Sequence, residues 1–518
     1  PLWVNERKIE DGTGGDGTVL LKIARWLVLD NVVEFYRNMT EVKANSNTPE
    51  FKDKRQYFTV DKTDADFLRA NPTVIRIGNK AINPLSLAEA HMRRNAYAPT
   101  LKQKADYLGN ETANLNLNAA GLLEVAVVDD NGNKVGRATE YDSALWTSVY
   151  GLSQVLRYQT TGDQEALANF RRVLNGILML TEITGDPKQF ARSIAISPES
   201  ENLGEGWIQG KGPYANLKWR QGGNNDMAKA FFITFAAAHK VIPYNDPLAA
   251  RIARASHALL NYEPIYSRGG NKGLAHGLIA IWDKDESELP WYTNAMTNLI
   301  TVLGDSTELD LGFYIGGVAD WSGINLTMLS NVAQILISEE ILTIWPVRGK
   351  GYATYQALKA GQERLWEMQK IYKAAHRDFL TIFAYAFSPN ARRDKNFPAE
   401  AKEAVWTLRE APAPRNVGDG AVDLLRSPAW KVSAWPRTPW KVVGGLKKIK
   451  DNATYINMVQ SAYAYPLFEM SAWSTTFYWK DCPFFFAYSG NKSLKPFSSD
   501  YLVMYWAARA SGLITDQE

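Results

Sequence analysis

Hydrophobic residues recur at helical spacing through most of residues 139–187. Two runs, at 145–156 and 167–178, carry apolar side chains three or four positions apart, which places them on one face of an α-helix. Between the runs, Gly162 supplies a helix stop and Asp163 a helix start. The segment therefore predicts two antiparallel helices joined by a short turn.

Similar helical patterns continue along the chain, separated by connections rich in glycine, asparagine or proline. Helices paired by short turns, with longer loops on the other side, are typical of an (α/α) toroid. In such a fold, inner helices surround a funnel, outer helices cover them, and the functional cleft is expected where the long loops gather. Further helices are predicted at residues 18–41, 83–97, 224–241, 246–262, 289–303, 312–337, 351–388 and 500–513.

Two stretches break the helical pattern. Residues 122–137 alternate between apolar and polar positions and turn at Asp130-Asn131-Gly132, so they predict a β-hairpin. The oxygen-bearing side chains at 129–133 suit calcium, but the twelve-position loop with a terminal Glu is missing, so a simple turn is the favoured interpretation. Residues 197–222, rich in glycine and aromatic residues, predict a long loop.

The hairpin also marks the expected domain boundary. Residues 1–120 are interpreted as an N-terminal helical and irregular extension, and residues 121–518 as the toroid domain that the hairpin opens. The extension, in particular residues 1–60, is the natural place for a protein partner to bind.

Composition narrows the function classes. The 518 residues are 46% hydrophobic and 22% charged, as in ordinary globular proteins, and a net charge of +3 gives no electrostatic case for nucleic acid. No apolar run reaches the roughly 18 residues of a membrane span. A single cysteine, Cys482, excludes an internal disulfide and a cysteine-rich zinc site. The five histidines form no HExxH motif, so we expect neither a metal nor a cofactor.

The chain begins at Pro1 rather than at an initiator methionine, which we interpret as the result of leader removal. The scarcity of cysteine and the many loops rich in Asn, Gly and Asp agree with that interpretation. We therefore expect a secreted or periplasmic bacterial protein, although a cytoplasmic protein can have the same composition.

Aromatic residues are abundant, with 17 Trp, 24 Tyr and 20 Phe, and many stand beside Gly, Asn or Asp. Aromatic side chains with a polar group suit clefts that bind sugars, so carbohydrate is the expected partner. The alternative is that these residues fill the wide core of a large helical protein. The candidate substrate-binding residues on the expected rim are Trp146, Trp207, Tyr214, Trp219, Arg220, Asn225, Asp320 and Trp321.

Two carboxylates, Asp142 and Asp226, stand in the first turns of the two best candidates for inner helices. Such residues often cap a helix or interact with its dipole. If both point into one funnel, they form an acid/base pair for glycan cleavage. A separation of about 5 Å would indicate a retaining hydrolase, and about 6.5–9.5 Å an inverting one.

A polysaccharide lyase needs a base and a group that neutralises the uronate carboxylate. His276, within a glycine-flanked segment that we expect to be a turn, and Tyr141 are candidate bases, while Asn225 and Arg220 are candidate neutralising groups. A lone histidine is more often a hydrogen-bonded structural residue, and that alternative stays open for His276.

Four segments together resemble a family of bacterial, exported proteins with six-hairpin helical toroids. They are residues 141–187, WRQGGNNDMAKAFF at 219–232, the helix from Asn325 into Ile344-Trp345-Pro346, and DYLVMYWAARASGLI at 500–514. The resemblance implies a mainly α fold of the (α/α)6 type. Related sequences often read S-R-D-Q where this chain has Asn224 to Met227, so only Asp226 is retained. The same architecture holds many glycoside hydrolases and polysaccharide lyases, and carbohydrate chemistry follows by analogy of fold.

The leading hypothesis is a toroid that binds a polysaccharide and cleaves it by hydrolysis or β-elimination. The alternative is a non-enzymatic binding or structural subunit of an envelope or extracellular assembly, which the departure at Asn224-Asn225 favours. An isoprenoid cyclase or prenyltransferase shares the toroid but needs an Asp-rich magnesium motif or a zinc set. Asp481-Cys482 provides only part of such a set, with no suitable histidine downstream.

Overall fold

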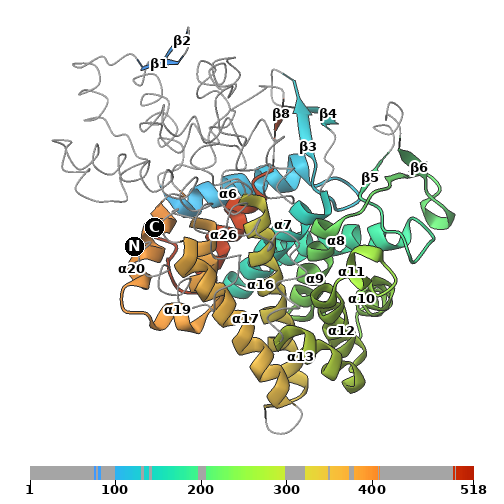
Figure 1. Cartoon of the computed structure of the whole chain (residues 1–518). Helices are drawn as coiled ribbons and strands as arrows, with labels where there is room; N and C mark the ends of the chain where they lie inside the picture. The colour runs from blue at the N-terminus through green and yellow to red at the C-terminus, as the bar shows by residue number, and fades with distance from the viewer. Residues whose placement is uncertain are drawn as a thin grey trace, which may run out of the picture.

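The structure is a computed structural model of the chain, and it is mainly helical (Figure 1). Helices make up 70% of the described residues, and the sheets among them are small and antiparallel, which confirms the predicted fold class at this level. The predicted helices at 18–41 and 83–97 lie outside the described residues. The structure describes residues 75–77, 80–82, 100–129, 133–138, 143–196, 206–297, 321–347, 351–372, 378–406, 408, 494–495 and 497–517.

Six helices of the described chain are buried along most of their length. Their sequences are apolar or small on every side, as expected of helices that other elements surround. In the helix at 225–239, for example, every residue from 227 to 238 is buried. The six are α7 (Ser143–Thr161), α9 (Asn225–His239), α12 (Gly269–Asp283), α16 (Trp321–Ile344), α18 (Asp378–Phe387) and α26 (Ser499–Ala510).

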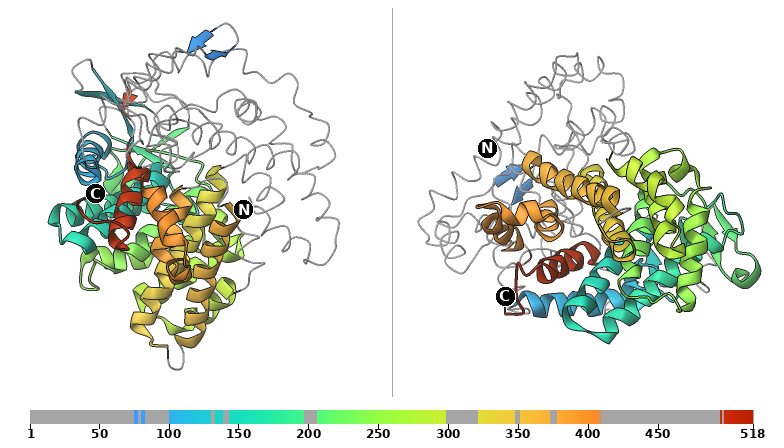
Figure 2. Two further views of the ribbon diagram at one scale, coloured as in Figure 1. Left: turned by 90° about the vertical axis from the view of Figure 1, so that its left-hand side faces the viewer. Right: turned by 90° about the horizontal axis from the view of Figure 1, so that it is seen from below.

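The buried helices contact one another in a closed series. Helix α26 packs on α7, α7 on α9, α9 on α16, α16 on α18, and α18 packs back on α26. Seen from below, α26, drawn in red, lies between the orange helices and the teal α7 and α8 (Figure 2). Helix α12 contacts both α9 and α16, yet α9 and α16 also touch directly. The closed series therefore has five members in the described part of the chain, and α12 packs beside it on α9 and α16.

More amphipathic helices cover this assembly. The pair α7 and α8 is the hairpin predicted from the sequence: Gly162 adopts φ +71° after α7, and Asp163 accepts a hydrogen bond from the backbone of Glu165 to start α8. Helix α8 buries one face, which includes Phe170 and Ile177. The covering helices and their partners are α8 (Gln164–Glu182) on α7, α10 (Pro247–Leu259) and α13 (Leu289–Thr297) on α12, α17 (Gly351–Tyr372) on α16, α20 (Phe397–Trp406) on α18, and α6 (Leu101–Glu111) on α26.

Helices α7 and α26 run in the same direction. The Trp146 ring, near the start of α7, lies 5.6 Å from Phe497, just before α26 begins. Towards the other ends, the Arg157 guanidinium lies 6.0 Å from the Trp506 ring. Their N-terminal ends therefore meet on one side.

Helices α9 and α12 are parallel as well. Their starts are joined by Asn271 Nδ2, which donates to Asn225 Oδ1 at 2.8 Å, and near their ends Trp282 Nε1 donates to the Phe235 carbonyl at 3.1 Å. The last residue of α9, His239, contacts Glu340 near the end of α16. The C-terminal ends of these helices thus lie on a common side.

Small sheets stand at the N-terminal side of the helices. The predicted hairpin at 122–137 is confirmed, and a third short strand joins it in the order β4-β3-β8. A second sheet, in the order β5-β7-β6, corrects the prediction of a loop at 197–222, because two of its strands lie there. These strands have three residues each, too few for a recognisable alternation. The strands are β1 (Ile75–Ile77), β2 (Lys80–Ile82), β3 (Val125–Val128), β4 (Lys134–Ala138), β5 (Ser193–Ala195), β6 (Trp207–Gln209), β7 (Lys218–Arg220) and β8 (Leu494–Lys495).

Candidate functional site

Two of the buried helices each follow directly on a strand. The two strands belong to different sheets, and side-chain contacts join these sheets. Strand β4 precedes α7, and β7 precedes α9. Arg137 of β4 donates from Nη1 to the Ile194 carbonyl of β5 at 3.1 Å, and its guanidinium lies 5.6 Å from the Trp207 ring. Since α7 also packs on α9, the two strand–helix connections lie side by side at one end of the assembly.

The second sheet carries three of the predicted substrate-binding residues. Trp207 pairs with Arg220 across β6 and β7, and both side chains are half-buried. Trp219 is only 4% exposed, because neighbouring residues of a strand point to opposite faces and its side chain joins the core. Trp207 and Arg220 are thus the more accessible members of this set.

The start of α9 carries Asp226. Asn224 caps the helix by accepting a hydrogen bond at Oδ1 from the Met227 backbone at 3.2 Å, and Asp226 follows in the first turn, half-buried. A carboxylate there interacts favourably with the helix dipole. Its proposed partner Asp142 and the candidate base Tyr141 both lie outside the described residues.

Below this turn, a buried lysine joins α9 to α12. Lys229 is 2% exposed, and its Nζ donates to Asn271 Oδ1 at 2.7 Å and to Asn225 Oδ1 at 3.3 Å. Asn271 Nδ2 in turn donates to Asn225 Oδ1 and to the Pro264 carbonyl. A buried ammonium needs such polar partners, because removal from water strongly disfavours its charge.

Two further polar groups adjoin these residues. The Tyr262 hydroxyl lies against Gly223, where an added Cβ would come within 1.7 Å of it. Arg268 donates from Nη1 to the Pro264 carbonyl at 3.4 Å. Burial raises the pKa of the Tyr262 hydroxyl, which therefore stays protonated as a donor. We refer to Asn225, Lys229, Asn271, Tyr262 and Arg268 as the α9–α12 cluster.

Sequence reasoning named only Asn225 among these five. A signal for Lys229 does exist, because it is the one charged residue between 227 and 238 and stands four positions after Asn225. That spacing puts the two side chains on one face of a helix. No comparable signal marks Asn271, Tyr262 or Arg268, whose roles depend on how α12 packs against α9.

Two predicted rim aromatics have structural partners. Trp146 is largely buried and packs on Phe497. Tyr214 donates its hydroxyl hydrogen to the Glu182 carboxylate, which also accepts 2.9 Å bonds from Arg251 Nε and Nη2. Burial and the adjacent Glu182 raise the pKa of Tyr214 to about 12. Tyr214 is thus tied to the outer helices α8 and α10.

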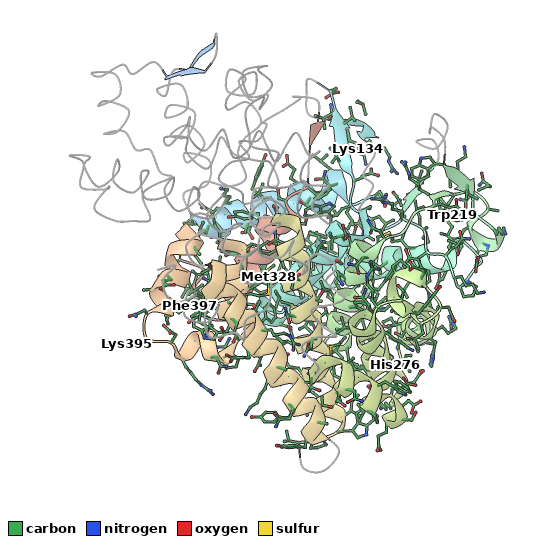
Figure 3. All side chains as sticks on the ribbon, in the orientation of Figure 1. Lys134, Trp219, His276, Met328, Lys395 and Phe397 are labelled. Carbon is green, nitrogen blue, oxygen red and sulfur yellow. The ribbon has the colours of Figure 1, made fainter. Side chains whose placement is uncertain are left out.

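His276 lies in the middle of α12 rather than in a turn, which corrects the sequence-based expectation. Five residues separate it from Asn271, a rotation of about 140° around a helix, so the two side chains are on different faces. Its Nδ1 bonds to the Glu288 carboxylate, and its ring stacks on Trp291 at 5.6 Å. Figure 3 accordingly shows His276 well away from Trp219, which marks the second sheet.

The glycines around His276 serve close packing between helices. A Cβ on Gly273 would lie 2.3 Å from Ala295 Cβ, and one on Gly277 would lie 2.6 Å from Ile337 Cγ2. Such distances are too short for any real Cβ, so α13 and α16 approach α12 only because these side chains are missing. The glycines that suggest a turn in the sequence are therefore explained by close packing between helices.

The remaining candidates and site types are placed as follows. Trp321 begins α16, whereas Asp320 lies outside the described residues. Within the described chain, no group of three or more His, Cys, Asp or Glu side chains is arranged to hold a metal ion. Of the hairpin turn, Asp129 is described, and its carboxylate accepts hydrogen bonds from the backbone and side chain of Asn133. No helix in the part of the chain that the structure describes has the length and hydrophobicity of a membrane span.

Comparison with known proteins adds no family to this description. The chain matches no family model, no curated protein and no solved structure. The resemblance to six-hairpin toroids therefore stays a prediction, and the site must be argued from its own geometry.

Proposed function

We propose that this chain is a glycan-active protein built on an (α/α)6-type toroid, which binds a polysaccharide at the N-terminal side of its buried helices and cleaves it by hydrolysis or β-elimination. One observation carries the proposal. The starts of α9 and α12 bring together a half-buried acid, Asp226, and the buried polar α9–α12 cluster, beside the accessible Trp207 and Arg220.

The helix contacts support the toroid. The closed series α7, α9, α16, α18 and α26, with α12 beside it, is what a ring of inner helices would give, and covering helices pack on its members. The direct contact between α9 and α16 makes this ring narrower than a regular six-membered one. Asp226 and the α9–α12 cluster lie on the side where the helices begin, as expected for the functional rim.

In this proposal, Asp226 acts in acid/base chemistry together with Asp142. A sugar ring would stack on Trp207, and Arg220, paired with it across the strands, would bind sugar hydroxyl or carboxylate oxygens. Tyr141 remains a candidate base for elimination, and Asp320 and Trp321 remain candidate rim residues, whereas His276 bonds to Glu288 on another face of α12. Hydrolysis needs a second carboxylate, whereas elimination needs a base and a neutralised uronate.

A cleavage screen over neutral and acidic polysaccharides tests the proposal. Reducing-end release reports any cleavage, and ultraviolet absorbance of an unsaturated uronate reports elimination specifically. We expect Asp226→Asn and Asp142→Asn each to lower the rate by at least about a hundredfold, as for loss of an acid/base group. Asp106→Asn is the matched control, because Asp106 pairs with Lys102 on the exposed face of α6. Unchanged cleavage in both active-site variants would show that the assignment is wrong.

The alternative, a non-enzymatic toroidal binding or structural subunit, has one specific observation in its favour. Asn224, which stands where the related sequences have another residue, is occupied by capping α9. The same screen separates the two functions: glycan binding without any cleavage would support the binding subunit.

A further inference from the structure

We infer that the α9–α12 cluster binds the carboxylate of an acidic sugar, so that the glycan this chain takes contains uronic acid. The inference rests on the function proposed above and names its substrate class. It depends on three buried hydrogen-bond donors that have no acceptor within the described residues: Asn225 Nδ2, Tyr262 Oη and Arg268 Nε.

The orientation of the Asn225 amide is fixed by its neighbours. Its oxygen accepts from Asn271 Nδ2 and from Lys229 Nζ, so the nitrogen must be the atom that points away from both. Asn225 is 8% exposed, which leaves this NH2 group little access to water. A buried donor without an acceptor is destabilising, and a ligand oxygen that accepts from it would remove that cost.

Tyr262 contributes a second donor, close to the start of α9. Its side chain is 5% exposed, and its ring packs 4.5 Å from the Phe190 ring. The hydroxyl is held against the backbone of Gly223, two residues before Asn225. A side chain at position 223 would displace it, so the close approach depends on glycine.

Two basic side chains stand among these donors. Lys229 and Arg268 bring an ammonium and a guanidinium, and Arg268 occupies the N-cap position of α12. Helices α9 and α12, with 15 residues each, both begin here, and their dipoles place partial positive charge at that end. Two carboxylates also adjoin the cluster: Glu263 is exposed and Asp226 is half-buried, whereas the three donor atoms are fully buried.

An oxyanion satisfies this arrangement better than a neutral group. Helix N-termini and charged donors favour anions, and a carboxylate offers two oxygens to separate donors. The neighbouring Trp207 and Arg220 would hold the sugar ring that carries the carboxylate.

Calorimetric titration of the full chain with matched oligosaccharides tests the inference. The probes are oligogalacturonate, oligomannuronate and hyaluronan fragments, each paired with its carboxyl-reduced counterpart. We expect at least one acidic probe to bind about tenfold or more tightly than its reduced form, the equivalent of one charge-assisted hydrogen bond. That binding should also weaken as salt is added.

Tyr262→Phe and Tyr292→Phe form a matched pair of variants. Tyr262→Phe removes a donor of the cluster and should lower affinity for the acidic probe about tenfold. Tyr292 is also buried, but its hydroxyl is bonded to the Gln334 carbonyl and to Ser338 Oγ, so Tyr292→Phe should leave affinity unchanged. Thermal unfolding of both variants in the absence of probe confirms that each is folded.

The outcomes separate this inference from the proposed function. Equal binding of acidic and reduced probes, or full affinity in Tyr262→Phe, would overturn the carboxylate site while the glycan-active function stands. Absence of binding to every acidic and neutral glycan would overturn the function itself and the inference with it. Preferential binding that Tyr262→Phe weakens supports both.

Discussion

A buried charge cluster joins the C-terminal ends of α9 and α16 at the level of single residues. Glu340 is 6% exposed and contacts His239 Nδ1 at 2.5 Å and Lys240 Nζ at 2.7 Å. Burial alone would raise the pKa of Glu340, but the hydrogen bonds and positive charges of His239 and Lys240 outweigh it and hold that pKa below its usual range. Burial would lower the pKa of Lys240, whereas Glu339 and Glu340 raise it overall.

These shifts predict how stability depends on pH. The unfolded chain binds a proton at Glu340 near pH 4.3 and the folded chain does so only at lower pH, so acid favours unfolding. The free energy of unfolding should therefore fall as pH drops below about 4.3. The Lys240 contribution is complete below about pH 10.4 and is lost as pH rises through its folded value.

The substitution Glu340→Gln isolates the part of the free energy of unfolding that is lost in acid. It should lower the free energy of unfolding at neutral pH by roughly 2 kcal/mol, since charge-assisted bonds are lost from a buried site, and it should flatten the fall in acid. The control is Glu339→Gln, which removes a more exposed partner of Lys240 and should cost well under 1 kcal/mol. Urea unfolding between pH 3 and pH 8 measures both, and an unchanged acid slope in Glu340→Gln would contradict the assignment.

For single residues, the sequence predicts roles that depend only on neighbouring positions in the chain, such as ending or beginning a helix. Asp226 stands in a first helical turn as predicted, and Gly162 and Asp163 end and begin helices as predicted. The α9–α12 cluster was largely missed, because its hydrogen bonds connect positions about forty residues apart. Local pattern carries no information on such contacts.

At the scale of elements, glycine sets how closely helices approach. Gly277→Ala places a methyl group 2.6 Å from atoms of both Ile337 and Tyr292, in a core with no room for it. We expect a loss of about 1–3 kcal/mol in the free energy of unfolding, because overpacking forces α12 away from α13 and α16. Chemical denaturation of the purified variant measures the loss.

Gly109→Ala is the matched control and should act in the opposite sense. In α6 the new methyl group would meet only Leu502 Cδ2, at an ordinary 3.8 Å. Alanine restricts the unfolded chain and favours the helix, so stability should rise by about 0.5–1 kcal/mol. Equal effects of the two substitutions would show that helix propensity, rather than packing, governs Gly277.

Most of the longer helices could be predicted, whereas strands of three residues and the glycine-rich helix α12 could not. Helices α8 and α10 have one apolar face, and the predicted segments match them closely. The three-residue strands β6 and β7 have no period to detect, and they exist because each pairs with a neighbour. Helix α12 was missed, because its glycines resemble a turn until α13 and α16 are placed beside it.

For the whole molecule, α26 is the helix that completes the closed series of contacts. It lies near the C-terminal end of the described chain and packs on α7, from the first predicted hairpin, and on α18. Most of its side chains are fully buried, and large ones contribute about 1.5–3 kcal/mol each on burial. Its sequence predicted a helix, but a terminal position alone does not indicate so central a place.

Removing α26 should therefore unfold the described assembly rather than trim it. Five side chains from Tyr501 to Tyr505 are 0% exposed, and their burial amounts to on the order of 10 kcal/mol, comparable with the total stability of a domain. A chain ending at Phe497 should fail to give a cooperative thermal transition by circular dichroism. A chain ending at Ile514 loses the exposed Thr515, Asp516 and Gln517 and the Arg509–Asp516 ion pair, and should unfold like the full chain. Cooperative unfolding of the shorter chain at an unchanged temperature would contradict the central role of α26, and with it the closed arrangement on which the proposed rim depends.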